Sequence, residues 1–142
     1  MIHVLLDTNI LLNVWLHDPA KPRPMASESA RILAVAADGL INTYITPSTF
    51  ATTYYFLRKF TGPSKARNLA TDILDCTAII PQDEKIFRKA LTGGWTDVED
   101  AAQYEAALMW PSISMICTSD TNHYRKAIGI KVVDPAALLR MI

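Results

Sequence analysis

The chain has 142 residues, of which 50% are hydrophobic, 20% charged and 8% aromatic. This length suits one domain with a full core, and the apolar content excludes a disordered, coiled-coil or collagen-like chain. The 14 Lys and Arg residues balance the 14 Asp and Glu residues, so the net charge is zero. This charge disfavours a strongly basic nucleic-acid-binding protein. A nucleic-acid partner still fits if positive and negative charges are separated on the surface.

Short apolar segments alternate along the chain with longer helical patterns. Strands are predicted at residues 2–6, 43–45, 78–80, 114–118 and 131–133. Helices are predicted at residues 7–16, 27–38, 48–59, 65–75, 84–91, 97–109 and 135–141, and a proline-rich loop at 19–24. Strands separated by helices require crossover connections, so we expect an α/β fold with a parallel sheet covered on both faces, in a single domain over residues 1–142.

Acidic side chains stand where two of the predicted strands end. Asp7 follows the first strand and Asp120 follows the fourth, while Asp97, Glu99 and Asp100 begin the helix that leads into the fourth strand. No side chain of comparable basicity is interleaved with them, and carboxylates that gather without cationic partners repel one another. A hard cation such as Mg²⁺ or Mn²⁺ removes that repulsion. The pattern therefore favours metal-assisted attack of water on a phosphodiester.

Each acidic residue also has a purely structural explanation. Asp7 is suited to cap the first helix, Asp97 with Asp100 resembles a capping box, and Asp120 is placed to cap a short helix. Two further aspartates that precede helices are interpreted as caps alone, namely Asp83 and Asp134.

The cysteines and histidines show no metal-binding pattern. Cys76 and Cys117 form no disulfide framework, and Cys117 falls in a strand that we expect to be buried. The histidines are scattered at His3, His17 and His123, so a metal site built on histidine is not expected. Because Asp7 interrupts the apolar start and no apolar run approaches ~20 residues, we expect a soluble cytoplasmic protein with no membrane segment.

Three segments of the chain match known sequence motifs in order and spacing. They are Leu-Leu-Asp-Thr-Asn-Ile-Leu-Leu at 5–12, Asp-Val-Glu-Asp-Ala-Ala-Gln-Tyr at 97–104 and Ile-Cys-Thr-Ser-Asp at 116–120. Over essentially its whole length the chain resembles PIN-domain ribonucleases, the family that includes the VapC toxins, in the subgroup with an Asp-x-Glu-Asp-Ala motif. The resemblance implies a three-layer α/β/α sandwich with a five-stranded parallel sheet, and Mg²⁺- or Mn²⁺-dependent cleavage of RNA.

The resemblance also implies roles for individual residues. The catalytic metal ligands would be Asp7, Asp100 and Asp120, with Asp97 as a further acid at the metal. The groups that orient these carboxylates and water would be Thr8, Asn9, Glu99 and Thr118.

The chain departs from the family pattern at two places. The family often has a glutamate on the helix after the second strand, where this chain has Thr52, and the subgroup commonly lacks it too. The subgroup also often reads Arg-Asn after the strand-four Thr, with an Asp-Phe pair downstream, whereas this chain has Ser119-Asp120 and His123-Tyr124. Either a ligand has moved to Asp120, or one has been lost.

Basic side chains that could contact RNA form a few local groups along the chain. The local basic groupings are Arg58-Lys59, Lys65, Arg67 and Arg125-Lys126. They are candidates for phosphate contacts, or else solvated helix ends. The aromatic run at residues 54–56 either stacks on bases or belongs to the core or a dimer interface.

Two functions from different classes follow. The first is a metal-dependent endoribonuclease, the toxin of a toxin–antitoxin pair, that forms a homodimer, binds a cognate antitoxin and leaves a 5′-phosphate and a 3′-hydroxyl on RNA. The second is a catalytically weak PIN-like module that binds RNA or another protein. Mn²⁺-dependent cleavage that is lost on Asp7→Asn would distinguish them.

Overall fold

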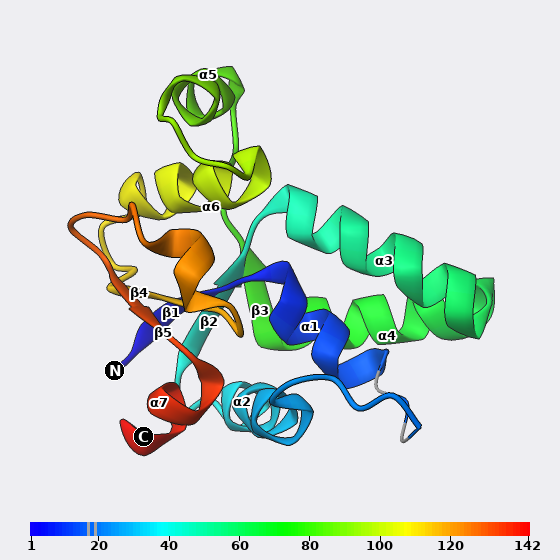
Figure 1. Ribbon diagram of the computed structural model, residues 1–142. Helices are drawn as coiled ribbons and strands as arrows, with labels where there is room; N and C mark the ends of the chain where they lie inside the picture. The colour runs from blue at the N-terminus through cyan, green and yellow to red at the C-terminus, as the bar shows by residue number, and fades with distance from the viewer. Residues whose placement is uncertain (17, 19) are drawn as a thin grey trace.

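The computed structural model describes residues 1–16, 18 and 20–142, and its sheet has five parallel strands (Figure 1). The strands are β1 (His3–Leu6), β2 (Asn42–Ile45), β3 (Thr77–Ile79), β4 (Met115–Cys117) and β5 (Lys131–Val133). Each agrees with a predicted strand to within one residue at both ends. His17 and Pro19, which belong to the predicted histidine set and proline-rich loop, lie outside the described residues.

The strand order β3-β2-β1-β4-β5 places β1 at the centre of the sheet. From β1 the chain moves outward through β2 to β3 and then returns to the other side of β1 as β4. In parallel sheets, ligands bind in the crevice beyond the carboxyl ends of the strands at such a reversal of strand order. Leu6 pairs with Cys117, and the Asp7 amide donates to the Cys117 carbonyl at 2.9 Å. The ends of β1 and β4 therefore lie side by side.

The helices follow the predicted pattern, with boundaries set by local chemistry. They are α1 (Thr8–Trp15), α2 (Ala26–Ala37), α3 (Pro47–Thr61), α4 (Pro63–Cys76), α5 (Glu84–Thr92), α6 (Val98–Leu108) and α7 (Pro135–Arg140), with a 3₁₀ helix, η1 (Thr121–Tyr124), after β4. The predicted caps at Asp83 and Asp134 are confirmed, because their carboxylates accept from the amides of Ile86 (3.1 Å) and Ala137 (2.7 Å). None of the helices built from the described residues is long and apolar enough to cross a bilayer.

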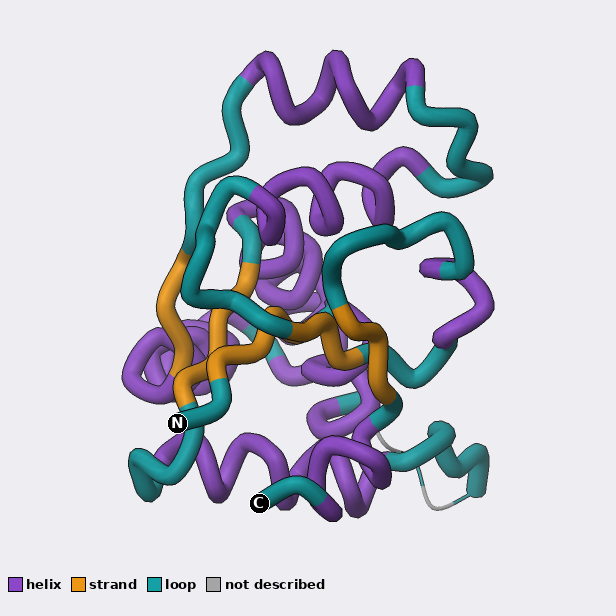
Figure 2. Tube along the Cα trace, turned by 90° about the vertical axis from the view of Figure 1, so that its left-hand side faces the viewer, coloured by secondary structure: helices purple, strands orange, loops and turns teal. Residues whose placement is uncertain are grey.

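Helices cover both faces of the sheet, as Figure 2 shows. Val4 and Leu6 point into one core with side chains of α1, α2, α3, α4 and α7, whereas Leu5 points into a second core with α5 and α6. Cys117 is fully buried in the first core, as predicted. On α6 the small side chains of Ala101, Ala102, Ala106 and Ala107 are buried, which lets the helix lie close over the strands. The start of α6 then lies near the ends of β1 and β4.

Candidate active site at the ends of β1 and β4

Asp7 is the first residue after β1 and is only 4% exposed. Its Oδ1 accepts hydrogen bonds from the Thr8 amide (2.7 Å) and from Gln103 Nε2 (2.9 Å). Its Oδ2 accepts from Thr118 Oγ1 (2.8 Å) and Asn9 Nδ2 (3.2 Å). Burial raises the pKa of Asp7, and the bonds from Gln103, Thr118 and Thr8 offset part of that rise. Asp7 therefore caps α1 and also belongs to a buried polar network.

Thr118 and Asn9 connect the two strand ends. Thr118 Oγ1 accepts from the Asp120 amide (3.1 Å) and from Asn9 Nδ2 (3.2 Å). Asn9 Oδ1 accepts from the Ser119 amide at 3.1 Å. These bonds fix the direction in which the chain leaves β4, and so the position of Asp120 relative to Asp7.

The start of α6 brings its own acids to the same edge. Asp97 caps α6 by accepting from the Asp100 amide at 3.1 Å. Glu99 Oε1 accepts from Thr8 Oγ1 at 3.1 Å, which joins α6 to α1. Asp97 therefore caps α6, as predicted, and Glu99 contacts α1 through Thr8.

Asp100 is the second buried acid of the site, with 7% of its surface exposed. Its Oδ1 accepts from the Tyr124 hydroxyl at 3.3 Å, but its buried Oδ2 accepts no hydrogen bond. Burial, followed by the charges of Asp7 and Asp97, raises the pKa of Asp100 to about 7, against the opposing effects of His123 and Tyr124. A buried carboxylate oxygen without a donor is rare in folded proteins and points to a missing partner.

Asp120 and Asp100 are bridged by one side chain, His123. Its Nε2 lies 3.1 Å from Asp120 Oδ2, and its Nδ1 lies 3.4 Å from Asp100 Oδ2. The turn of η1 carries the His123 ring back between the two acids, a placement that the spacing along the sequence did not predict. Asp120 does not cap η1 with its side chain.

Comparison with known proteins decides the family. The sequence matches the PIN domain family over residues 3–122. The chain belongs to the PIN domain family. The predicted family and fold class are thereby confirmed, whereas no finding tests the Asp-x-Glu-Asp-Ala subgroup. The sequence has no significant match among curated proteins.

Solved structures of low sequence identity share the fold of this PIN domain. The structure of FitAB bound to IR36 DNA fragment matches with 21% identity over 93% of this chain and 94% of that chain, at a TM-score of 0.59. A toxin–antitoxin complex from Klebsiella pneumoniae matches with 18% identity over 93% and 97%, at 0.65. FitAcB from Neisseria gonorrhoeae matches with 20% identity over 94% and 98%, at 0.58.

Three residues at the site of this PIN domain were missed by sequence reasoning. Gln103 is fully buried and bonds to Asp7, and its place one helical turn after Asp100 was a usable signal. Tyr124 bonds to Asp100, and no sequence pattern marked it. On α3 it is Thr49 whose hydroxyl lies 2.9 Å from that of Thr8, while half-buried Thr52 makes no side-chain hydrogen bond among the described residues.

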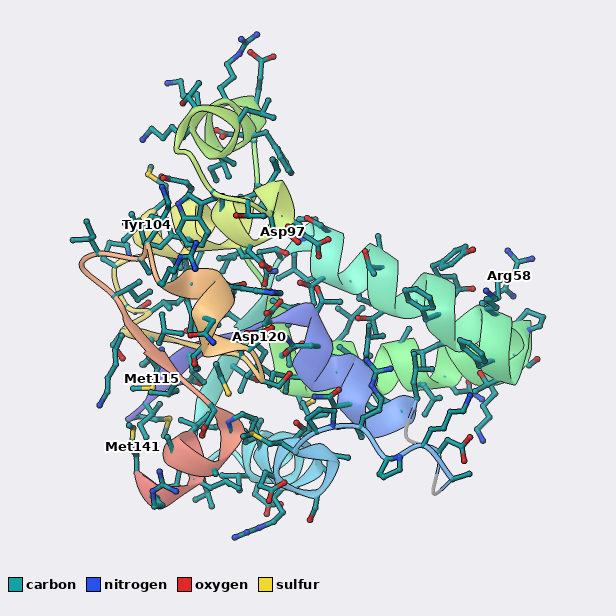
Figure 3. The ribbon with its side chains drawn as sticks, in the orientation of Figure 1. Arg58, Asp97, Tyr104, Met115, Asp120 and Met141 are labelled. Atoms are coloured by element: carbon teal, nitrogen blue, oxygen red, sulfur yellow. The ribbon has the colours of Figure 1, made fainter. Side chains whose placement is uncertain are left out.

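The predicted RNA contacts of this PIN domain fall in two different places. Arg58 lies at the outer end of α3, far from Asp97 and Asp120 (Figure 3). Arg58 and its neighbour Lys59 are nine or more residues beyond Thr49, which corresponds to about 13 Å along the helix. The exposed Arg125 and Lys126 instead follow η1 directly.

The acidic side chains at the site of this PIN domain are of the chemical type that binds a hard divalent cation. The acids at this edge offer carboxylate oxygens, and Asp100 Oδ2, with the His123 ring 3.4 Å away, accepts no hydrogen bond. Among the described residues, however, no three His, Cys, Asp or Glu side chains lie close enough together to hold one ion. The His123 ring lies between Asp100 and Asp120.

Proposed function

We propose that this PIN domain, a single domain over residues 1–142, is a Mg²⁺- or Mn²⁺-dependent endoribonuclease. The observation that carries the proposal is the buried Asp100 Oδ2, which accepts no hydrogen bond beside a second buried acid, Asp7. Burial raises the pKa of both residues, and the charges of Asp7 and Asp97 raise that of Asp100 further, so the fold holds these carboxylates at an energetic cost. A cation that removes this cost gives the arrangement a function.

The proposed ligands are Asp7, Asp100 and Asp120, with Asp97 adding negative charge. A Mg²⁺ or Mn²⁺ ion held by these residues would polarise the scissile phosphate and lower the pKa of water. Attack of water on the phosphorus, with loss of a proton from the water and gain of one by the departing 3′-oxygen, would leave a 5′-phosphate and a 3′-hydroxyl.

The remaining polar residues hold these acids in position. Asn9 and Thr118 fix Asp7 Oδ2, and Thr8 fixes Glu99. Arg125 and Lys126 are the proposed phosphate contacts close to the acids, and Arg58 and Lys59 would contact RNA further along the strand.

We further propose that the protein is the toxin of a toxin–antitoxin pair. The support is the shared fold with structures described as a toxin–antitoxin complex and as FitAB bound to DNA. Its partners would be RNA in the cytoplasm, a cognate antitoxin and a second copy of the chain.

A catalytically weak module that binds RNA or protein is the second candidate. It is favoured by the contacts of His123 with two of the proposed ligands and by Thr52 in place of the glutamate. Induced expression of wild type and Asp7→Asn, with mapping of the RNA ends that appear, separates the two functions. New 5′-phosphate ends with wild type alone support the nuclease. Equal RNA ends in both cultures favour the module.

A further inference from the structure

The ring of His123 occupies the space between two of the proposed cation ligands. Nδ1 faces Asp100 Oδ2 at 3.4 Å and Nε2 faces Asp120 Oδ2 at 3.1 Å. The two nitrogens of an imidazole ring point in different directions, so the two carboxylate oxygens lie on different sides of the ring. Whichever of its nitrogens carries a proton, the ring fills this space.

An imidazole ring and a small divalent cation cannot share that position. Both oxygens of a chelating pair must come within about 2.1 Å of one Mg²⁺ ion, and Mn²⁺ needs a similar approach. In this structure Asp100 Oδ2 lies 3.4 Å from Nδ1 of His123, and Asp120 Oδ2 lies 3.1 Å from Nε2. The imidazole ring therefore stands between the two oxygens.

We propose that His123 holds the place of the divalent cation in the metal-free protein and must swing out before the ion binds Asp100 and Asp120. The inference rests on the proposed cation site and adds a residue that sets its affinity. His123 is thus a positioning residue, because it acts through the two carboxylates.

The surroundings of His123 allow this exchange. Its side chain is 58% exposed, and its two carboxylate contacts are the side-chain interactions found for it among the described residues. The next residue, Tyr124, is instead buried, packs edge-on against Trp95 with ring centroids 5.7 Å apart, and bonds to Asp100. The ring of His123 can therefore turn into solvent while Tyr124 keeps the backbone of η1 in place.

The test is the affinity for Mn²⁺ of the intact chain, measured by calorimetry at one fixed pH. We expect His123→Ala to bind Mn²⁺ about tenfold more tightly than wild type, because the ion no longer has to displace a ring that contacts both carboxylates. Asn122→Ala is the matched control, since Asn122 is the exposed neighbour in η1 and makes no side-chain hydrogen bond in the described part of the chain. Its affinity should equal that of wild type.

A second measurement needs no variant. Long-range nitrogen–proton NMR spectra of wild type should show the His123 ring signals moving toward those of a solvent-exposed imidazole as diamagnetic Mg²⁺ is added. Unchanged ring signals at saturation would overturn the inference.

The outcomes separate this inference from the proposed function. If wild type binds Mn²⁺ and cleaves RNA but His123→Ala binds no more tightly, the inference about His123 fails and the nuclease stands. Weaker binding by His123→Ala would make His123 a ligand and also overturn it. If neither protein binds Mn²⁺ or cleaves RNA with it, the proposed function fails together with the inference.

Discussion

Replacing Asp100 by asparagine should stabilise the metal-free protein at neutral pH and remove its cleavage activity. Burial and the charges of Asp7 and Asp97 raise the pKa of Asp100 from 3.8 to about 7. The native state therefore holds this proton more tightly than the unfolded chain does. The resulting stability is fully present below a pH of about 4 and is lost as the pH rises through about 7.

The expected gain in Asp100→Asn can be bounded from this shift. A change in pKa from 3.8 to about 7 corresponds to at most about 4 kcal/mol. The neighbouring side chains of His123 and Asp120 are 58% and 46% exposed, so water lies close to Asp100, and solvent screening reduces that figure to about 1–2 kcal/mol. Asparagine keeps an oxygen that can accept from the Tyr124 hydroxyl, so no donor loses its partner.

The assay is urea unfolding with a chelator present, at several pH values between about 4 and 8. The free energy of unfolding of Asp100→Asn should equal that of wild type at the acid end and exceed it by about 1–2 kcal/mol at the alkaline end. Each kcal/mol corresponds to a rise of roughly 3–4 °C in Tm. The matched control is Asp38→Asn, at an exposed carboxylate without a side-chain hydrogen bond among the described residues. It should keep the pH dependence of wild type.

One result would refute this reasoning. If Asp100→Asn were less stable than wild type at every pH, the carboxylate would be a stabilising group in the metal-free fold. Asp100 would then be a structural residue, and the stored repulsion on which the site argument depends would not exist.

Asp7→Asn should also abolish cleavage, and it should lower the free energy of unfolding by about 1 kcal/mol. The reason is that the new amide group would face some of the four donors that now bond to the carboxylate. A stable and active variant would contradict this. Asp120→Asn should lose activity without loss of Tm, since its side chain is 46% exposed, and full Mn²⁺-dependent activity would show that it is not a ligand. Mn²⁺ should raise the Tm of Thr52→Glu more than that of wild type, because a further carboxylate on α3 adds negative charge near the site. An equal rise in both proteins would mean that Thr52 faces away from the site.

The fold of this PIN domain could be predicted from its sequence because its signals are local. Buried parallel strands read as short apolar runs, and the break between α3 and α4 follows from Gly62, which has a φ of 84°, and Pro63. Asp83 and Asp134 mark helix starts by the chemistry of their side chains. Each of these features depends on a few neighbouring residues.

The candidate site could be predicted only as far as topology determines it. Strand order alone brings Asp7 and Asp120 to one edge, because both follow strands that pair in the sheet. The place of His123 depends on the turn of η1, and the bond from Gln103 depends on how α6 sits over β1. Such side-chain directions come from packing over the whole chain, so sequence spacing did not reveal them.

The central claim is that the acids at the ends of β1 and β4 support metal-dependent hydrolysis of RNA. Its most direct test is incubation of the purified protein with single-stranded RNA, with Mn²⁺ or with a chelator, followed by analysis of the fragment ends. We predict fragments with 5′-phosphates for wild type with Mn²⁺ alone, and none for Asp100→Asn, a variant expected to remain folded. Cleavage that persists in the chelator, or that is equally fast in Asp100→Asn, would contradict the account.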